Sequence, residues 1–106
     1  MEKRERRTRP ATIAEEEVLH VTASGVAIDE DKRKVISVRK FVTDPAFVRV
    51  SAGVTKTTAP FEYLRIDVAV TVPCYVEEVD KVFARTEEKV AEFLDAAIEN
   101  YMGSQG

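Results

Sequence analysis

The sequence predicts an α+β fold in which an antiparallel β-sheet of three to four strands packs on one long C-terminal α-helix. Two segments of alternating apolar and polar residues, 47–55 and 63–72, predict half-buried strands, and an apolar stripe at helical spacing over 76–101 predicts the helix. Each segment has one apolar face, which must be buried against another element. At 106 residues, with 44% apolar and 33% charged residues, the chain suits a single domain over 17–106, preceded by a flexible basic arm over 1–16.

Two weaker strand signals follow the arm. Over 18–27, apolar residues recur at every second position, as in Leu19, Val21 and Ala23. The charged cluster 29–34 is typical of an exposed turn, and the alternation resumes over 35–41. The Thr43-Asp44-Pro45 tripeptide predicts the turn that ends this strand.

The clearest alternation begins at Phe47 and predicts a hairpin. Val48, Val50, Ala52 and Val54 share one face of the first strand, and Leu64, Ile66, Val68, Val70 and Val72 share one face of the second. The connection 56–61 is short, which favours antiparallel pairing. The opposite face of the hairpin carries Phe47, Arg49, Thr55, Tyr63, Arg65, Asp67 and Thr71.

A long helix is predicted after Pro73, which lacks the backbone donor that a strand needs. It begins near Val76, and acidic residues occupy its first turns, where the helix dipole favours negative charge. About 26 residues give a helix of roughly 39 Å, whereas strands of about eight residues span roughly 27 Å. We therefore expect the apolar end of the helix to overhang the sheet and to need a partner.

Charge is distributed unevenly along the chain, whose net charge is −3. Residues 1–10 carry +3, residues 11–73 carry −1 and residues 74–106 carry −5. The bases of the arm that are candidates for contact are Arg4, Arg6, Arg7 and Arg9. Such an arm either contacts phosphates, threads onto a neighbouring subunit, or has no fixed structure.

Residues capable of catalysis are few, and we predict neither an enzyme nor a metal or cofactor site. The only histidine, His20, has no evident nucleophile beside it, and the only cysteine, Cys74, is expected to be a buried residue at the strand-to-helix corner. Asp29 and Asp31 lack the glycine and the later glutamate of a calcium loop. A single cysteine cannot form an internal disulfide, which favours a reducing cytosol, and no apolar run is long enough to span a membrane.

Two groups of residues are candidates for binding a partner. Arg49, Tyr63 and Arg65 combine positive charge with an aromatic ring, as surfaces that bind single-stranded nucleic acid do. The alternative for this face is an ordinary solvated sheet with local pairs such as Arg65 and its neighbour Asp67. The second group is the basic arm.

The segments 50–55, 61–70 and 73–79 carry the aromatic residues Phe61 and Tyr63 before Arg65, with Val68 three residues after it, a Pro-Cys corner and an acidic helix start. Over about 47–102 the chain resembles a family of small, functionally uncharacterised proteins of tailed bacteriophages. The resemblance implies a viral context, in the virion or in the cytoplasm of an infected bacterial host, and implies no site residues. Our first hypothesis is an accessory or assembly protein that forms a homo-oligomer and binds a protein partner. Our second is a single-stranded nucleic-acid-binding protein that uses the polar sheet face, the arm, or both.

Overall fold

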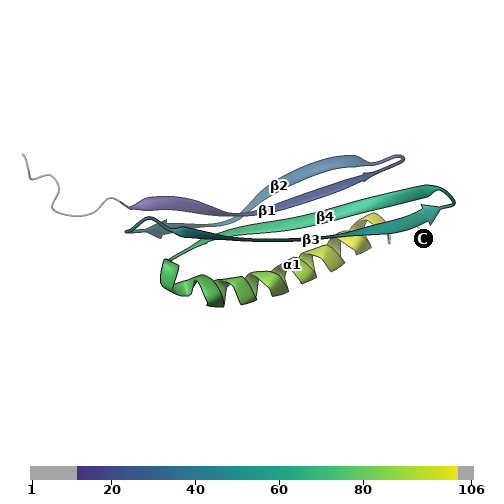
Figure 1. Ribbon diagram of the computed structural model, residues 1–106. Coiled ribbons are helices and arrows are strands. Elements are labelled where there is room, and N and C mark those ends of the chain that lie inside the picture. Colours follow the sequence, from purple (N-terminus) through teal and green to yellow (C-terminus); the bar gives the residue numbers. More distant parts are fainter. Residues whose placement is uncertain (1–11, 103–106) are drawn as a thin grey trace, which may run out of the picture.

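The computed structural model describes residues 12–102, which form a four-stranded sheet covered on one face by a helix (Figure 1). The elements are β1 (Ile13–Gly25), β2 (Asp29–Phe41), β3 (Ala46–Ala59), β4 (Glu62–Cys74), the short 3₁₀ helix η2 (Val76–Glu78) and α1 (Val79–Met102). All neighbouring strands pair antiparallel, in the order β2-β1-β4-β3. The predicted fold class, an antiparallel sheet on one long C-terminal helix, is confirmed.

Two long hairpins make the sheet, and they join through the pairing of β1 with β4. The backbone N–H of Gly25 donates to the carbonyl of Ile28 at 2.7 Å and closes the first hairpin. The second hairpin turns at Pro60 and Phe61, and Phe61 has a φ of 64°. Pro60 and Phe61 are the two central residues of the turn. The proline ring fixes the φ that the first of them needs, and Phe61 takes the left-handed conformation, as in a type II turn.

The structure corrects two predicted element boundaries. The charged cluster 29–34 belongs to β2 and is not a turn, because its backbone pairs with β1 while its side chains reach solvent on an edge strand. Residues 13–16, predicted as part of the arm, are the first residues of β1. The rest of that arm, 1–11, lies outside the described residues, and with it the four arginines named above.

The helix does not overhang the sheet. The strands have 13 or 14 residues rather than about eight, so they span about 43 Å. The 24 residues of α1 span about 36 Å. The sheet is the longer layer, and Figure 1 shows the β3–β4 hairpin reaching beyond the end of α1.

The core lies between α1 and the inner hairpin. Ile66, Val68 and Val70 of β4 are fully buried, and Val90 of the helix packs against them. The helix packs on β3 and β4, whereas β2 is exposed along its length except at the half-buried Glu30 and the buried Phe41. One helix therefore covers about half of a four-stranded sheet, and three uncovered surfaces follow from this arrangement.

Candidate binding surfaces

The open face is the side of the sheet opposite α1, and it carries the residues that the sequence predicts there. In the β3–β4 register Arg49 lies opposite Thr71, Thr55 opposite Arg65, and Thr57 opposite Tyr63. Side chains alternate between faces along a strand, so these residues share the open face with Phe47 and Asp67. The predicted composition of this face is correct.

The register nevertheless separates the predicted cation–aromatic group into two parts. Arg49 is six residues from Thr55, the partner of Arg65, so Arg49 and Arg65 are separated by about 20 Å. Phe47 and Arg49 lie toward the β2–β3 connection, whereas Tyr63 and Arg65 lie toward the tip of the second hairpin. The structure does not bring Arg49, Tyr63 and Arg65 into one contact surface.

Arg65 is also occupied by its own neighbours. Its Nη2 donates to Oδ1 of Asp67 at 2.7 Å and its Nε donates to Oδ2 at 3.0 Å, while its Nη1 donates to the hydroxyl of Thr55 at 3.2 Å. The guanidinium lowers the pKa of Asp67 by hydrogen bonding. The pair lies across Gly53, where a Cβ would collide with the Asp67 carboxylate. The local pair between Arg65 and Asp67 that the sequence suggests for this face is present.

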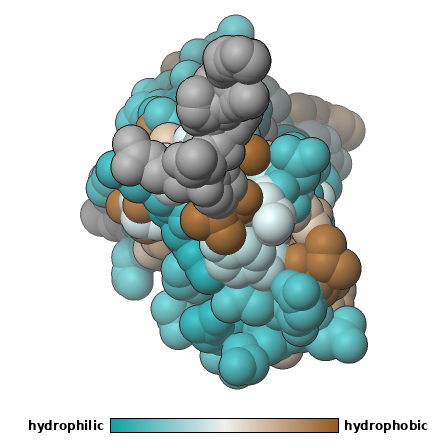
Figure 2. Space-filling model, turned by 90° about the vertical axis from the view of Figure 1, so that its left-hand side faces the viewer, coloured by the Kyte–Doolittle hydropathy of each residue, from teal (hydrophilic) through white to brown (hydrophobic). Residues whose placement is uncertain are grey.

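The remainder of the open face has an apolar area near the start of β3. Phe47 and Val38 are more than half exposed, and they line a shallow hollow with Val18 and Thr71. Seen from this end of the molecule, hydrophobic patches lie among mostly hydrophilic side chains (Figure 2). Arg49 is an exposed cation next to this area along β3, and Glu15, Glu16 and Arg33 also line the hollow.

A groove runs on the helix side, between α1 and the uncovered hairpin β1–β2, and we call it the helix-side groove. Its walls include the apolar side chains Leu19, Val21, Phe93, Ala97 and Tyr101. Four residues of β2 form the outer edge: Lys32 and Lys34 lie on the helix face, whereas Asp31 and Arg33 alternate to the open face. The volume is about 740 Å³. The groove therefore combines an apolar floor with a rim of net positive charge.

One end of this groove is fixed by Tyr101. Its hydroxyl donates to Oε1 of Glu30 at 2.7 Å, and Nζ of Lys32 lies 6.0 Å from the centre of its ring. The hydrogen bond to Glu30 raises the pKa of Tyr101. The same hydrogen bond is the main cause that lowers the pKa of Glu30, and the hydrogen bond from Lys32 is the second. These contacts attach the last turn of α1 to β2 across the open half of the sheet.

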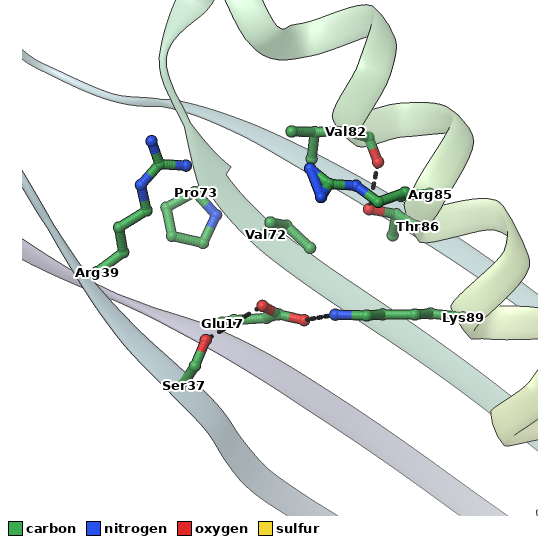
Figure 3. A pocket seen from close by; sticks show the side chains of 9 residues that line it. All are labelled: Glu17, Ser37, Arg39, Val72, Pro73, Val82, Arg85, Thr86 and Lys89. Atoms are coloured by element: carbon green, nitrogen blue, oxygen red, sulfur yellow. Dashed lines mark hydrogen bonds and ion pairs between the residues drawn. The ribbon is translucent and has the colours of Figure 1, made fainter.

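A smaller cleft of about 240 Å³ lies at the other end of the uncovered hairpin (Figure 3). Glu17 of β1 accepts from Nζ of Lys89 at 2.8 Å and from the hydroxyl of Ser37 at 3.2 Å. Arg39 is paired with Glu78 at 3.1 Å, and Figure 3 shows Arg85 on the helix side of the cleft. At the cleft, β1 is therefore paired by charge with α1, and β2 with η2.

Cys74 and His20, the two residues considered for catalysis from the sequence, lie in different surroundings. Cys74 is fully buried, as predicted, and burial followed by the negative charge of Glu78 raises the pKa of its thiol. Nε2 of His20 contacts Oδ1 of Asp31 at 2.5 Å across the β1–β2 hairpin, a partner that the sequence reasoning missed. Among residues 12–102, no three His, Cys, Asp or Glu side chains are grouped so that they could hold a metal ion.

Comparison of the chain with protein-family models, with curated proteins and with solved structures found no match. Within the described part of the chain, no helix has the length and apolar character needed to cross a membrane. Function is therefore inferred from the uncovered surfaces.

Proposed function

We propose that the protein is a non-enzymatic accessory or assembly protein, of the type encoded by tailed bacteriophages, that self-associates and binds a protein partner. It would act in the virion or in the cytoplasm of an infected bacterial host. The observation that carries the proposal is the incomplete helical layer, since one helix packs on β3 and β4 and leaves the same face of β1 and β2 open.

The dimensions of the open half suit a second helix. Neighbouring strands are about 4.8 Å apart, so two strands offer a width of roughly 10 Å, close to the diameter of a helix. Leu19 and Val21 on the floor are only partly buried and would lose exposure under such a helix. A partner segment would also meet the positive rim formed by Lys32 and Lys34 on the helix face. These features favour an amphipathic helix whose apolar stripe is flanked by acidic residues.

We assign no reaction, because Cys74 is buried and His20 is hydrogen-bonded to a carboxylate. Cys74 is buried with a raised pKa, so little of it is the thiolate that reacts. His20 is held by Asp31 on an exposed strand. The proposal is therefore one of binding.

Sedimentation velocity of the full chain tests self-association. We expect the weight-average sedimentation coefficient to rise over the micromolar range as monomers associate. A single monomeric species at every concentration would refute the self-association half of the proposal.

A pair of labelled peptides tests the protein-binding half. One is an amphipathic helix with a leucine stripe flanked by glutamates, and its matched control has the same stripe flanked by lysines. Fluorescence anisotropy should show binding of the acidic peptide only, and more weakly at high salt. Lys34→Glu on the rim should weaken binding, whereas Arg49→Glu on the opposite face should not. Equal binding of both peptides, or equal effects of both variants, would contradict the groove as the site.

Labelled single-stranded DNA distinguishes the second hypothesis, nucleic-acid binding. The paired state of Arg65 and its distance from Arg49 give the open face little to offer a phosphate backbone. We expect salt-sensitive DNA binding to be absent or weaker than binding of the acidic peptide. Tight DNA binding that is lost on Arg49→Glu and kept on Lys34→Glu would favour the nucleic-acid hypothesis instead.

A further inference from the structure

We infer that the exposed edge of β3 is the self-association surface, and that it pairs antiparallel with β3 of a second copy about a two-fold axis. The two sheets would then form one continuous sheet of twice four strands. This inference rests on the proposed self-association and specifies where it occurs.

The sheet has two edges, β2 and β3, and each presents a row of backbone groups that pair with no strand of the described sheet. Proteins protect such edges with charges, prolines or bulges, because an unprotected edge is a template for another strand. The two edges of this sheet differ sharply in that protection. This difference is the basis of the inference.

The β2 edge is protected. Eight of its 13 residues are charged. Glu17 pairs with Ser37 and Val18 with Val35, so Ile36 is an extra residue that forms a bulge in the edge. Charge and irregular backbone both oppose the addition of a strand.

The β3 edge is not protected in this way. Only Arg49 and Lys56 are charged among its 14 residues, and it contains no proline. Its pairing with β4 runs without a register shift from Ala46 to Thr57. Seven of its other residues are valine, threonine or phenylalanine, types that favour strands, and the rest are small and uncharged.

The arrangement of charge on β3 is compatible with a second copy. A two-fold axis perpendicular to the sheet keeps both helices on one side and pairs odd-numbered residues with odd and even with even. With the axis at residue 52, the centre of 49–55, Arg49 on the open face lies opposite Thr55 of the second copy and Lys56 on the helix face opposite Val48, so no two cations lie opposite each other. On the helix face, the half-buried Val50, Ala52 and Val54 would be extended by the same residues of the partner.

Pairing of β3 with β3 of a second copy is also favoured over pairing of β3 with β2 of a second copy. Pairing β3 of one molecule with β2 of the next would be heterologous and would continue into a fibre, whereas β3 with β3 closes a dimer. The charges and the bulge of β2 disfavour the first arrangement. The unprotected edge is therefore expected to give a closed dimer.

Hydrogen exchange of individual backbone amides tests this pairing. In an edge strand, alternate amides point away from the sheet, so those of β3 are free in a monomer and bonded in the dimer. We expect the outward amides of 49–55 to exchange at least about tenfold more slowly at high than at low protein concentration. The outward amides of β2 are the internal control, and their exchange should not depend on concentration.

Two matched variants provide a second measurement. Ser51 and Val35 are exposed open-face residues of β3 and β2, respectively. Ser51→Lys should weaken the dimer about tenfold by adding like charges along the pairing edge, whereas Val35→Lys should leave it unchanged. Circular dichroism of both variants is the control that they remain folded.

The outcomes separate this inference from the proposed function. In one outcome, sedimentation detects dimers while the exchange of the β3 amides does not slow with protein concentration; in another, Val35→Lys disrupts the dimer while Ser51→Lys does not. In either case the β3 pairing is wrong and self-association stands. If the protein is monomeric at every concentration, both are wrong. Protection of β3 together with sensitivity to Ser51→Lys supports both.

Discussion

The ion pair between Glu17 and Lys89 gives the sharpest stability prediction, because one partner is largely buried and the other is not. The Glu17 side chain is 12% exposed and the Lys89 side chain 44% exposed. Replacing Lys89 by methionine keeps most of the apolar stem and leaves the Glu17 carboxylate with the hydrogen bond from the Ser37 hydroxyl. A buried charged group that loses a partner destabilises the folded state by about 1–3 kcal/mol.

Solvent access to Lys89 reduces this value. Because water screens the half-exposed ammonium, we expect Lys89→Met to lower the free energy of unfolding by about 1–1.5 kcal/mol. Glu17→Gln retains an acceptor for Ser37 and removes the charge, so its cost should be about 0.5–1 kcal/mol. The double variant no longer contains an unpaired charge, and we expect it to be more stable than Lys89→Met alone.

Urea unfolding followed by circular dichroism, with a double-mutant cycle, measures these differences. The protein is kept at a concentration where sedimentation shows one species, so that association does not contribute. Arg65 and Asp67 form a control pair of similar length, 2.7 Å, in which both side chains are about half exposed, and their coupling should be smaller. A double variant that is less stable than Lys89→Met would refute the reasoning, because the Glu17 charge would then cost nothing when unpaired.

Three further predictions concern the turn, the start of the helix and the thiol. Phe61 is 95% exposed and has a φ of 64°, so Phe61→Asn should raise the free energy of unfolding by about 0.5–1 kcal/mol in the same urea assay. The backbone N–H of Tyr75 and the guanidinium of Arg39 lower the pKa of Glu78 from 4.5. The ionised Glu78 carboxylate therefore stabilises the fold above about pH 4.5, and this stabilisation is lost as the pH falls through the lower pKa of the folded state. Glu78→Gln should make the acid-induced loss of stability shallower. Burial raises the pKa of Cys74, so a thiol reagent such as DTNB should modify it only at the rate of unfolding, and rapid reaction in the native protein would contradict its buried position.

The hairpin and the helix were predictable from sequence because each carries a sustained apolar period. Ile66 and Val68 recur at every second residue and are fully buried, as the alternation requires. β2 was only partly predictable, since both of its faces are exposed and an edge strand without an apolar face lacks that signal. Its residues 29–34 do alternate between the two faces of the sheet, but only the pairing with β1 shows it.

The binding surfaces were less predictable than the fold, because they depend on register and on distant contacts. Arg65 and Asp67 are two residues apart on one strand, so their pairing could be inferred from sequence alone. The separation of Arg49 from Tyr63 follows only from the register of β3 with β4. Glu17 and Lys89 are 72 residues apart, and no local pattern links them.

The two proposed surfaces have a combined consequence, since they lie on opposite halves of the same sheet. The β3 edge is the outer edge of the half that α1 covers, and the helix-side groove lies over β1 and β2. A two-fold axis perpendicular to the sheet would place the two helices side by side near the axis and both grooves outward on the same side. A dimer of this kind would present two equivalent grooves to a partner that itself has repeated binding segments. Modest affinity at each groove would then give strong attachment through multivalency, which is the property that an assembly protein needs.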